Sequence, residues 1–380
     1  MKLLSVATTL DPVSGGGSAA RTIEATRAVM DLGVECAMAT SGDGLEARMQ
    51  ITPWLRDLDV IGLPVCGGRF RVPYGKWALL RAAVRRADVV LLTNHWTVIN
   101  ALAGRYAHEA RVPYVVCPAG ALPVEGGRSR LLKRAYNALV GRTLIARASA
   151  HIAVTADETL QFASYGIDPA NVTVIPNAMP DTSAGDGNVF RDRHDLGAGP
   201  LLLFLGRLAP IKGPDLLIEA FARVADQRPG WRLVIAGPDD GMAAELKSRT
   251  AAFGLADRVA FVGFVDAAAK AQALAAADLL VVPSRREAMS IVVLEAASAG
   301  RAVLVTDQCG IPEVREAGGW VVPPTLDGLA DGLLDATRDR DVLMARGEVW
   351  RRMATARYAS STIAGNYVAL FSSVIAGSVR

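Results

Sequence analysis

Two glutamates eight positions apart, Glu287 and Glu295, are the residues whose types and spacing point most directly to chemistry. Glu287 lies in a loop after an apolar, strand-like run at 279–283, and Glu295 lies about one turn into the helix-like run that follows. Backbone N–H groups collect where a strand leads into a helix N-terminus, and they bind anions there. A carboxylate pair beside such a site suits a substrate that is both a polyol and a phosphate. The alternative is two glutamates that only solvate the surface.

Two other turns carry groups suited to phosphate. Arg207 and Lys212 flank the turn after the apolar run 200–206, where two cations can neutralise a departing diphosphate. The alternative is a surface pair on a loop. The segment DPVSGGGSAAR (11–21) places three glycines before a helix-like segment, which lets backbone approach a phosphate, although such a triplet can also be only a flexible turn.

The elements that must position these groups follow from length and periodicity. A chain of 380 residues with 51% hydrophobic residues predicts two domains of ordinary size. Uniformly apolar runs predict strands buried on both faces of parallel sheets, and their spacing indicates βα units. These runs lie at 2–7, 34–39, 88–93, 113–117, 150–154, 172–176, 200–206, 231–237, 258–263, 278–283, 301–306 and 319–323.

We therefore predict an α/β fold of two doubly wound, Rossmann-like domains whose carboxyl edges face a common cleft. A stretch rich in Gly, Asp and Ser marks the linker between them. The predicted parts are an N-terminal domain (1–180), the linker (181–199), a second domain (200–355), and a C-terminal helix (356–380) that packs back on the first domain.

At these residues the sequence resembles a known family. LGRLAPIKGPDLLIEAF (205–221) and PSRREAMSIVVLEAASAGRAVLVTDQCGIPEV (283–314) are similar to the retaining glycosyltransferase family 4, of group 1 type and GT-B fold. The resemblance covers almost the whole chain and includes the glycine triplet, PNAM (176–179) and GWVVPP near the end. It implies transfer of a sugar from a nucleoside diphosphate sugar with retention at the anomeric carbon. It also implies that domain 1–180 is the acceptor side and that domain 200–355 binds the nucleotide sugar.

The resemblance also implies roles for single residues. Arg207 and Lys212 would hold the donor diphosphate, and Glu287 would meet the donor sugar near its reacting carbon. Glu295 would bond the ribose hydroxyls, and the Gly16 backbone would contact phosphate.

Further donor contacts are expected from backbone groups. The loop amides at the helix N-terminus would add hydrogen-bond donors, the third glycine of the turn would lie beside Gly16, and two later loops would line the base pocket. The residues concerned are Ala288, Met289, Ser290, Ile291, Gly17, Gly237, Phe264 and Val265.

Two departures from the family pattern stand out. The family usually has Glu-Gly-Phe-Gly where this chain has Glu287, Ala288, Met289 and Ser290, which is expected to narrow the backbone freedom of the donor loop. Ala119 stands in a Pro-x-Gly turn where the family often has His or Arg. His95 fits a family position near the cleft and is a candidate catalytic residue, with a hydrogen-bonded structural histidine as the alternative.

Composition and motif content limit which cofactors and which cellular compartment we expect. The four cysteines and four histidines have no ligand spacing, so neither disulfides nor a metal site are indicated. We expect no cofactor and no metal requirement, since Arg207 and Lys212 already neutralise a diphosphate. No nucleic-acid reader motif is present, no apolar run reaches the length of a membrane span, and no signal peptide is visible, which predicts a cytoplasmic protein.

The net charge of +3 is unevenly placed. Between residues 126 and 150, basic residues and leucines alternate without a single acid, and the residues involved are Arg128, Arg130, Lys133, Arg134, Arg142 and Arg147. A basic amphipathic segment (128–147) is typical of a surface for anionic lipid, which predicts peripheral contact with the inner face of the membrane. The alternative is a solvated helix whose arginine stems cover the core.

The expected acceptor is accordingly a saccharide or a lipid-linked acceptor, as in polysaccharide or glycoconjugate biosynthesis. Two other functions stay open. One is a nucleotide-sugar-binding partner subunit with little activity, and the other is a GT-B enzyme of another reaction type, an epimerase or a phosphorylase.

Overall fold

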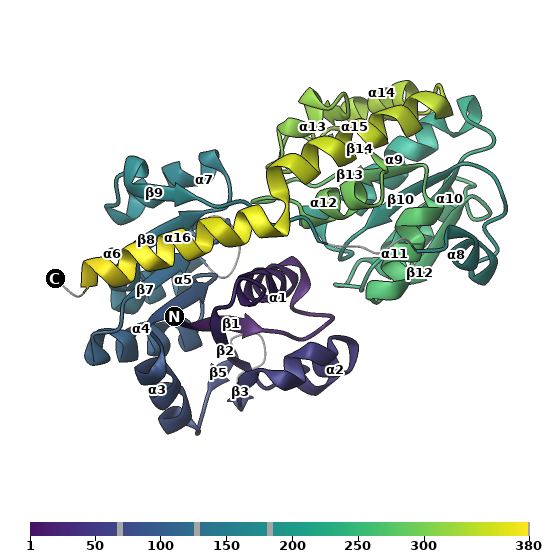
Figure 1. The fold of residues 1–380 in the computed structure, drawn as a ribbon. Coiled ribbons are helices and arrows are strands. Elements are labelled where there is room, and N and C mark those ends of the chain that lie inside the picture. Colours follow the sequence, from purple (N-terminus) through teal and green to yellow (C-terminus); the bar gives the residue numbers. More distant parts are fainter. Residues whose placement is uncertain (67–70, 125–129, 181–184, 379–380) are drawn as a thin grey trace. The chain divides into compact units, whose positions relative to one another are not determined.

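The computed structural model describes residues 1–66, 71–124, 130–180 and 185–378. The chain forms two compact units (Figure 1). Unit 1 contains Met1–Ala178 together with Ser360–Arg380, and unit 2 contains Met179–Ala359.

Unit 1 is built on a parallel sheet of seven strands in the order β3-β2-β1-β6-β7-β8-β9. The strands are β1 (Lys2–Thr9), β2 (Glu35–Ser41), β3 (Asp59–Leu63), β6 (Val89–Thr93), β7 (Tyr114–Cys117), β8 (Ala150–Ala153) and β9 (Val172–Val174), beside a short antiparallel pair, β4 (Val65–Cys66) and β5 (Val72–Pro73). Its helices are α1 (Gly16–Met30), α2 (Leu45–Ile51), α3 (Trp77–Arg86), α4 (Val98–Ala110), α5 (Arg130–Tyr136), α6 (Arg142–Ala146), α7 (Ala156–Thr159) and α16 (Ser360–Ser378).

Helix α16 completes unit 1 from the far end of the sequence by packing against α1 (Figure 1). Its buried side chains include Ile363, Tyr367 and Phe371. Within the described residues, the helical stretch Arg340–Ser378 is long and apolar enough to cross a membrane by length and composition alone. The same composition is expected of a helix that buries one face in a folded unit, as α16 does.

Unit 2 is built on a parallel sheet of six strands in the order β12-β11-β10-β13-β14-β15. The strands are β10 (Leu201–Leu205), β11 (Arg232–Ala236), β12 (Val259–Gly263), β13 (Leu279–Val282), β14 (Ala302–Thr306) and β15 (Trp320–Val322). Its helices are α8 (Gly187–Arg193), α9 (Pro214–Val224), α10 (Ala243–Ala252), α11 (Ala267–Ala276), α12 (Ile291–Ser298), α13 (Glu313–Glu316), α14 (Leu326–Ala336) and α15 (Arg340–Tyr358).

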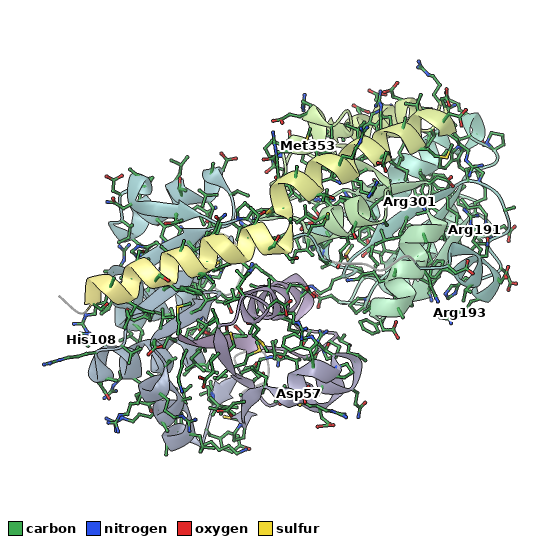
Figure 2. The ribbon with its side chains drawn as sticks, viewed as in Figure 1. Asp57, His108, Arg191, Arg193, Arg301 and Met353 are labelled. Carbon is green, nitrogen blue, oxygen red and sulfur yellow. The ribbon has the colours of Figure 1, made fainter. Side chains whose placement is uncertain are left out.

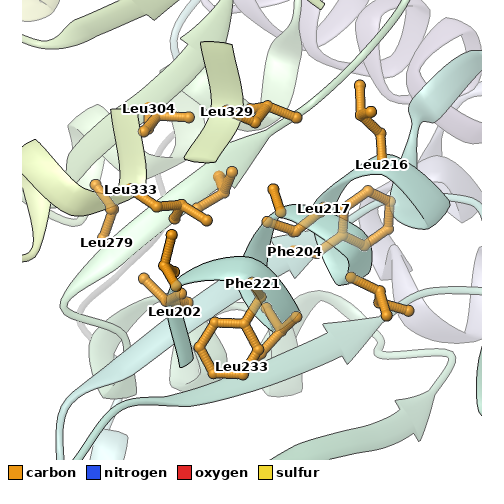
Figure 3. Close-up of a cluster of buried hydrophobic side chains, with 14 of the residues drawn as sticks. Leu202, Phe204, Leu216, Leu217, Phe221, Leu233, Leu279, Leu304, Leu329 and Leu333 are labelled. Atoms are coloured by element: carbon orange, nitrogen blue, oxygen red, sulfur yellow. The ribbon is translucent and has the colours of Figure 1, made fainter. Parts of the chain in front are cut away.

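The core of unit 2 joins the sheet to the helices that cover it. Leu202 and Leu233 from β10 and β11 pack with Leu217 and Phe221 of α9 and with Leu333 of α14 (Figure 3). These side chains are almost completely buried. Burial of a leucine or phenylalanine side chain contributes roughly 1.5–3 kcal/mol, so this cluster holds α9 and α14 against the sheet.

Each of the twelve apolar runs predicted as strands coincides with a strand in the structure. The edge strand β3 was missed because only two of its five residues, Ile61 and Leu63, are buried, so it has no continuous apolar run.

The predicted linker 181–199 begins with residues outside the described part. From Asp186 onward it is structured, and α8 buries Phe190 and packs against α11. The C-terminal helices meet at Ala359, so α15 belongs to unit 2 and α16 to unit 1.

Candidate functional site

The candidate site lies at the carboxyl edge of the unit 2 sheet, where β10 and β13 are parallel neighbours. The loop after β10 leads through a short 3₁₀ turn, Pro210–Lys212, into α9. The loop after β13 leads into α12. The backbone N–H of Arg285 donates to the carbonyl of Ile211 at 2.8 Å, which ties the two loops together.

Lys212 and Glu287 meet between these loops. The Lys212 ammonium lies 3.0 Å from Glu287 Oε1, and the Ser284 hydroxyl donates to the same oxygen at 2.5 Å. The Glu287 side chain is 10% exposed and that of Lys212 is 26% exposed. A nearly buried carboxylate with one cation and one hydroxyl as partners is held in a single orientation, and the half-buried ammonium can still reach a ligand.

Two glycines allow the loops of the site to lie close to each other. Gly213 has φ +69°, and a Cβ there would lie 2.2 Å from the carbonyl oxygen of Pro283. Gly310 has φ +67°, and its Cβ would lie 1.9 Å from the carbonyl oxygen of Ala288. The donor loop itself uses no left-handed residue at Ala288, Met289 or Ser290, so its conformation does not require glycine at these positions, and the expected narrowing of its backbone freedom stays a prediction. The positions that require glycine are instead Gly213 and Gly310, in the neighbouring loops.

The N-terminus of α12 lies in the same loop. Ser290 occupies the N-cap position with an extended backbone, yet its side chain makes no capping bond, and its buried hydroxyl has no partner among the described residues. The first amides of this helix, beginning with Ile291, therefore have no side-chain cap. Such a terminus carries a partial positive charge and suits an anion.

Glu295 is on α12, but it does not join the Lys212–Glu287 pair. Its side chain is 6% exposed and forms an ion pair with Lys270 of α11. Sequence reasoning missed Lys270, and no local signal could have found it, because the two residues are 25 positions apart on different helices.

Arg207 lies apart from Lys212. Its guanidinium is 3.4 Å from Asp240 in the loop after β11, and both side chains are exposed. Arg285, which the sequence did not single out, forms a two-pronged ion pair with Asp215 at 2.8 and 2.9 Å. The structure thus joins Lys212 with Glu287 and leaves Arg207 at the rim of the same edge.

The remaining predicted donor residues divide between the units. Gly237 follows β11, and Phe264 and Val265 follow β12, so all three lie at the carboxyl edge of unit 2, with Phe264 exposed. Gly16 and Gly17 form the first turn of α1 in unit 1, where Gly16 has φ +51° and no side chain caps the helix. The phosphate contacts of Gly16 and Gly17 stay predictions. The same holds for the base contacts of Gly237, Phe264 and Val265.

His95 follows β6 in unit 1 and is completely buried, at 0% exposure. Its ring meets those of Trp96, Tyr136 and Tyr165 edge-on, at centroid distances of 4.5, 5.5 and 5.3 Å. His95 Nε2 is 3.0 Å from Asn137 Oδ1, and Asn137 Nδ2 donates to the Tyr165 hydroxyl, which donates to the carbonyl of Leu122.

This chain of hydrogen bonds defines the tautomer of His95. A carbonyl can only accept, so the Tyr165 hydroxyl donates to it and accepts from the amide of Asn137, and Nε2–H of His95 donates to Asn137 Oδ1. Burial lowers the pKa of His95 to about 4. A neutral ring enclosed by aromatic side chains favours the structural alternative over a catalytic role.

Ala119, the departure in the Pro-x-Gly turn, has φ +48°, a left-handed conformation that is strained for a residue with a side chain. It follows β7, and the next amide, Gly120 N–H, donates to the buried carboxylate of Glu158. That carboxylate also accepts from the Val154 amide at 2.7 Å. Glu158 therefore fixes the turn through the Gly120 amide, and position 119 contributes no polar side chain.

Two family models together match most of the chain. The model described as "Glycosyl transferases group 1" matches residues 189–353, and the model described as "Glycosyl transferase 4-like domain" matches residues 16–178. A D-inositol 3-phosphate glycosyltransferase of Actinosynnema mirum is 28% identical over 373 residues, which cover 89% of each chain. An alpha-D-kanosaminyltransferase of Streptomyces kanamyceticus is 36% identical over 137 residues, 35% of each chain.

Solved structures share the fold over the full length. HepE of Anabaena, crystallised with UDP and glucose, superposes with a TM-score of 0.78 at 21% identity, covering 98% of this chain and all of that one. Sucrose-phosphate synthase of Thermosynechococcus elongatus gives 0.76 at 20% identity, covering 99% and 100%. These matches confirm the GT-B fold predicted from the sequence.

Proposed function

The chain belongs to the group 1 glycosyltransferases of GT-B fold, and from this premise we propose that it moves a sugar from a nucleoside diphosphate sugar with retention of the anomeric configuration. The Lys212–Glu287 pair at 3.0 Å, beside the uncapped N-terminus of α12, is the observation that carries this proposal. It brings a cation, a carboxylate and free amides to one place.

Each group has a separate part in the reaction. Sugar transfer passes through an oxocarbenium-like state, so positive charge develops on the sugar while negative charge develops on the leaving diphosphate. The Lys212 ammonium and the first amides of α12 stabilise the diphosphate. The Glu287 carboxylate, oriented by Ser284, faces the sugar and stabilises its positive charge. Lys270 orients Glu295 for the ribose hydroxyls.

No metal takes part in this scheme, because the cations at the edge of the sheet neutralise the diphosphate. Transfer should therefore persist in a chelating buffer. Loss of turnover on adding EDTA, restored by Mg²⁺ or Mn²⁺, would contradict this part of the proposal.

A nucleotide panel and a product assay test the proposal. UDP, GDP, ADP and dTDP are compared for the increase in melting temperature, since a ligand that binds only the folded state stabilises it by RT ln(1 + [L]/Kd). The matching nucleotide sugar is then offered with an acceptor, and NMR reads the anomeric configuration of the product. An inverted product would refute retention, and donor binding without transfer would favour the partner-subunit alternative.

For the acceptor, we infer a lipid-linked saccharide reached from the inner face of the membrane. The described part of the basic segment forms α5, a π-helical turn (Asn137–Gly141) and α6. Leu144 and Ile145 are buried, whereas Leu131 and Leu139 are 76% and 81% exposed beside Arg130 and Arg134. Exposed leucines among arginines suit the interface of an anionic membrane better than a solvated helix does. Arg128 lies outside the described residues.

Vesicle co-sedimentation tests this inference. Vesicles with anionic lipid should bind the protein at low salt and release it at high salt, with each basic residue near the surface adding roughly 1 kcal/mol. Leu131→Ser with Leu139→Ser should weaken binding, and Leu160→Ser, which alters an exposed leucine outside the segment, is the matched control. Absence of binding to anionic vesicles at low ionic strength would remove the membrane contact and leave the transferase proposal intact.

A phosphorylated polyol is a second candidate acceptor, favoured by the names of the relatives and by Arg71. The Arg71 guanidinium donates to the hydroxyls of Thr9, Ser41 and Ser14 at 2.8, 3.2 and 2.6 Å, at the carboxyl ends of β1 and β2. The same guanidinium lies 3.7 Å from the exposed carboxylate of Asp43, and an anionic group of the acceptor can take the place of these partners. Transfer to inositol phosphate that is lost in Arg71→Gln, with donor binding unchanged, would select this acceptor.

A further inference from the structure

A cavity of about 420 Å³ lies at the amino ends of the unit 2 strands, whereas Glu287 lies beyond their carboxyl ends. Asp278 directly precedes β13 and Arg301 directly precedes β14, so the cavity opens at the amino ends of the strands whose carboxyl ends carry the donor loop. Arg191 of α8 and Arg340 of α15 complete its charged lining together with Glu348. Every lining residue belongs to unit 2.

The cavity is rich in guanidinium groups. Three arginines line it against two carboxylates, and Glu348 is already paired with Arg351 at 2.8 Å and Arg352 at 3.8 Å. Asp278 alone remains to balance the three arginines. Burial is the main cause that lowers the pKa of Arg191; Asp278 acts against it, and the nearby positive charges of Arg340 and Arg301 lower the pKa further.

The arginines differ in how far their donors are used. Arg191 donates to the carbonyls of Gly197, Gly199 and Ala276 at 2.8, 2.7 and 2.6 Å and is thus a structural brace.

Arg340 and Arg301 keep donors free. Arg340 directs Nε and Nη2 to Asp278, and its Nη1 meets no acceptor among the described residues. Arg301 donates from Nη1 to the Ala277 carbonyl at 3.2 Å, while its Nε, shielded from solvent, has no partner in the described part of the chain.

The guanidinium charges that Asp278 leaves unbalanced favour an anionic ligand in the cavity. The Nη1 donor of Arg340, which Asp278 leaves unused, can donate to one oxygen of a phosphate group. A volume of about 420 Å³ lies in the range of small-molecule sites and leaves room for a body of monosaccharide size beside the phosphate.

We propose that this cavity is a second ligand site of unit 2, which binds a small phosphorylated molecule through Arg301 and Arg340. The ligand would join the starts of β13 and β14 to α15. The site is separate from the donor loop, so this inference does not depend on the proposed reaction.

Calorimetric titration of the full chain with inorganic phosphate and with glucose 6-phosphate tests the proposal, and glucose serves as the uncharged control. Lys212→Ala distinguishes binding in this cavity from binding at the Lys212–Glu287 site, because it removes the cation that a phosphate would contact at that second place. Arg193→Gln is the matched control, since Arg193 is an exposed arginine on α8 that does not line the cavity (Figure 2).

Glucose 6-phosphate should bind the wild-type chain, Lys212→Ala and Arg193→Gln equally, and glucose should not bind. Arg301→Gln and Arg340→Gln should each weaken binding about tenfold, the loss expected for one charged hydrogen bond. Arg340 is 53% exposed, so Arg340→Gln should fold and decides the question if Arg301→Gln does not. Binding lost in Lys212→Ala, unchanged in Arg340→Gln, or absent from the wild-type chain would overturn the proposal.

Discussion

Strand β6 of unit 1 and strand β13 of unit 2 occupy the same place in their sheets. Each pairs with the first strand of its unit, β1 or β10, at the point where the strand order reverses, and each is followed by a loop with a titratable side chain. Ligands of open α/β sheets bind at such points. His95 after β6 is completely buried, whereas Glu287 after β13 keeps an ion pair with a half-buried lysine.

Position in the topology therefore does not by itself determine whether a loop residue takes part in chemistry. His95 is satisfied by a neutral hydrogen-bonded chain through Asn137, and aromatic rings exclude water from it. Glu287 is held by Lys212 and Ser284, which are also suited to a charged ligand. Substitutions in the loop after β13 should therefore affect sugar transfer, whereas substitutions in the loop after β6 should affect stability.

Glu287→Gln should produce the largest effect. The side chain keeps its volume and can still accept from Ser284, but it loses the charge that stabilises the reacting sugar. We expect turnover to fall by two to three orders of magnitude, as when one electrostatic group is removed from an active site. Affinity for the nucleoside diphosphate should change little. Turnover at the wild-type level would contradict the assignment of Glu287.

Lys212→Ala should come next and should exceed Arg207→Ala. Lys212 contacts Glu287 in the site, and its removal leaves a nearly buried carboxylate without a counter-charge. Arg207 is exposed and paired with Asp240. Steady-state kinetics should show a large loss of kcat for Lys212→Ala and a smaller one for Arg207→Ala. Full kcat in both variants would place the diphosphate elsewhere.

Glu295→Ala should weaken binding of the nucleoside diphosphate rather than turnover at saturation. It removes the predicted ribose contact and also leaves Lys270 without its ion-pair partner. Calorimetry with the nucleotide selected by the panel measures the effect, and Glu219→Ala, which removes a carboxylate paired with Arg249 in the same unit, is a control for lost charge. Unchanged affinity in Glu295→Ala would refute the ribose contact.

His95 should have the smallest effect on transfer and a distinct effect on stability. Its pKa is about 4 in the folded state and 6.5 in an ordinary setting, so the unfolded chain takes up a proton as pH falls through 6.5 while the folded chain does not. The free energy of unfolding should therefore decrease between pH 6.5 and 4, by at most about 3 kcal/mol.

His95→Gln isolates this contribution, because glutamine does not titrate. The raised pKa of Glu158 acts in the opposite direction, so the difference between wild-type and variant curves is the quantity to measure. We expect the variant to lose part of the pH dependence and to keep turnover within about threefold, a change of less than 1 kcal/mol. Turnover abolished in a folded His95→Gln chain would restore the catalytic interpretation.

The sequence predicted the strands with continuous apolar runs and the loops that follow them, because buried parallel strands leave a direct pattern. It did not predict β3, which is half-exposed, or α8, whose Gly- and Asp-rich surroundings resemble a linker. Glu287 and Lys212 were found because each follows an apolar strand. Lys270 and the arginine cavity were not, since their residues come together only through packing.

A double-mutant cycle on Lys212 and Glu287 tests whether the two side chains act as one unit in sugar transfer. If they do, the second substitution removes little that the first has left, so the chain with both Lys212→Ala and Glu287→Gln should keep a far higher kcat/KM than the two single losses multiplied together predict. A coupling free energy of about 1 kcal/mol or more would support this joint role. Losses that multiply, as for distant residues, would contradict it.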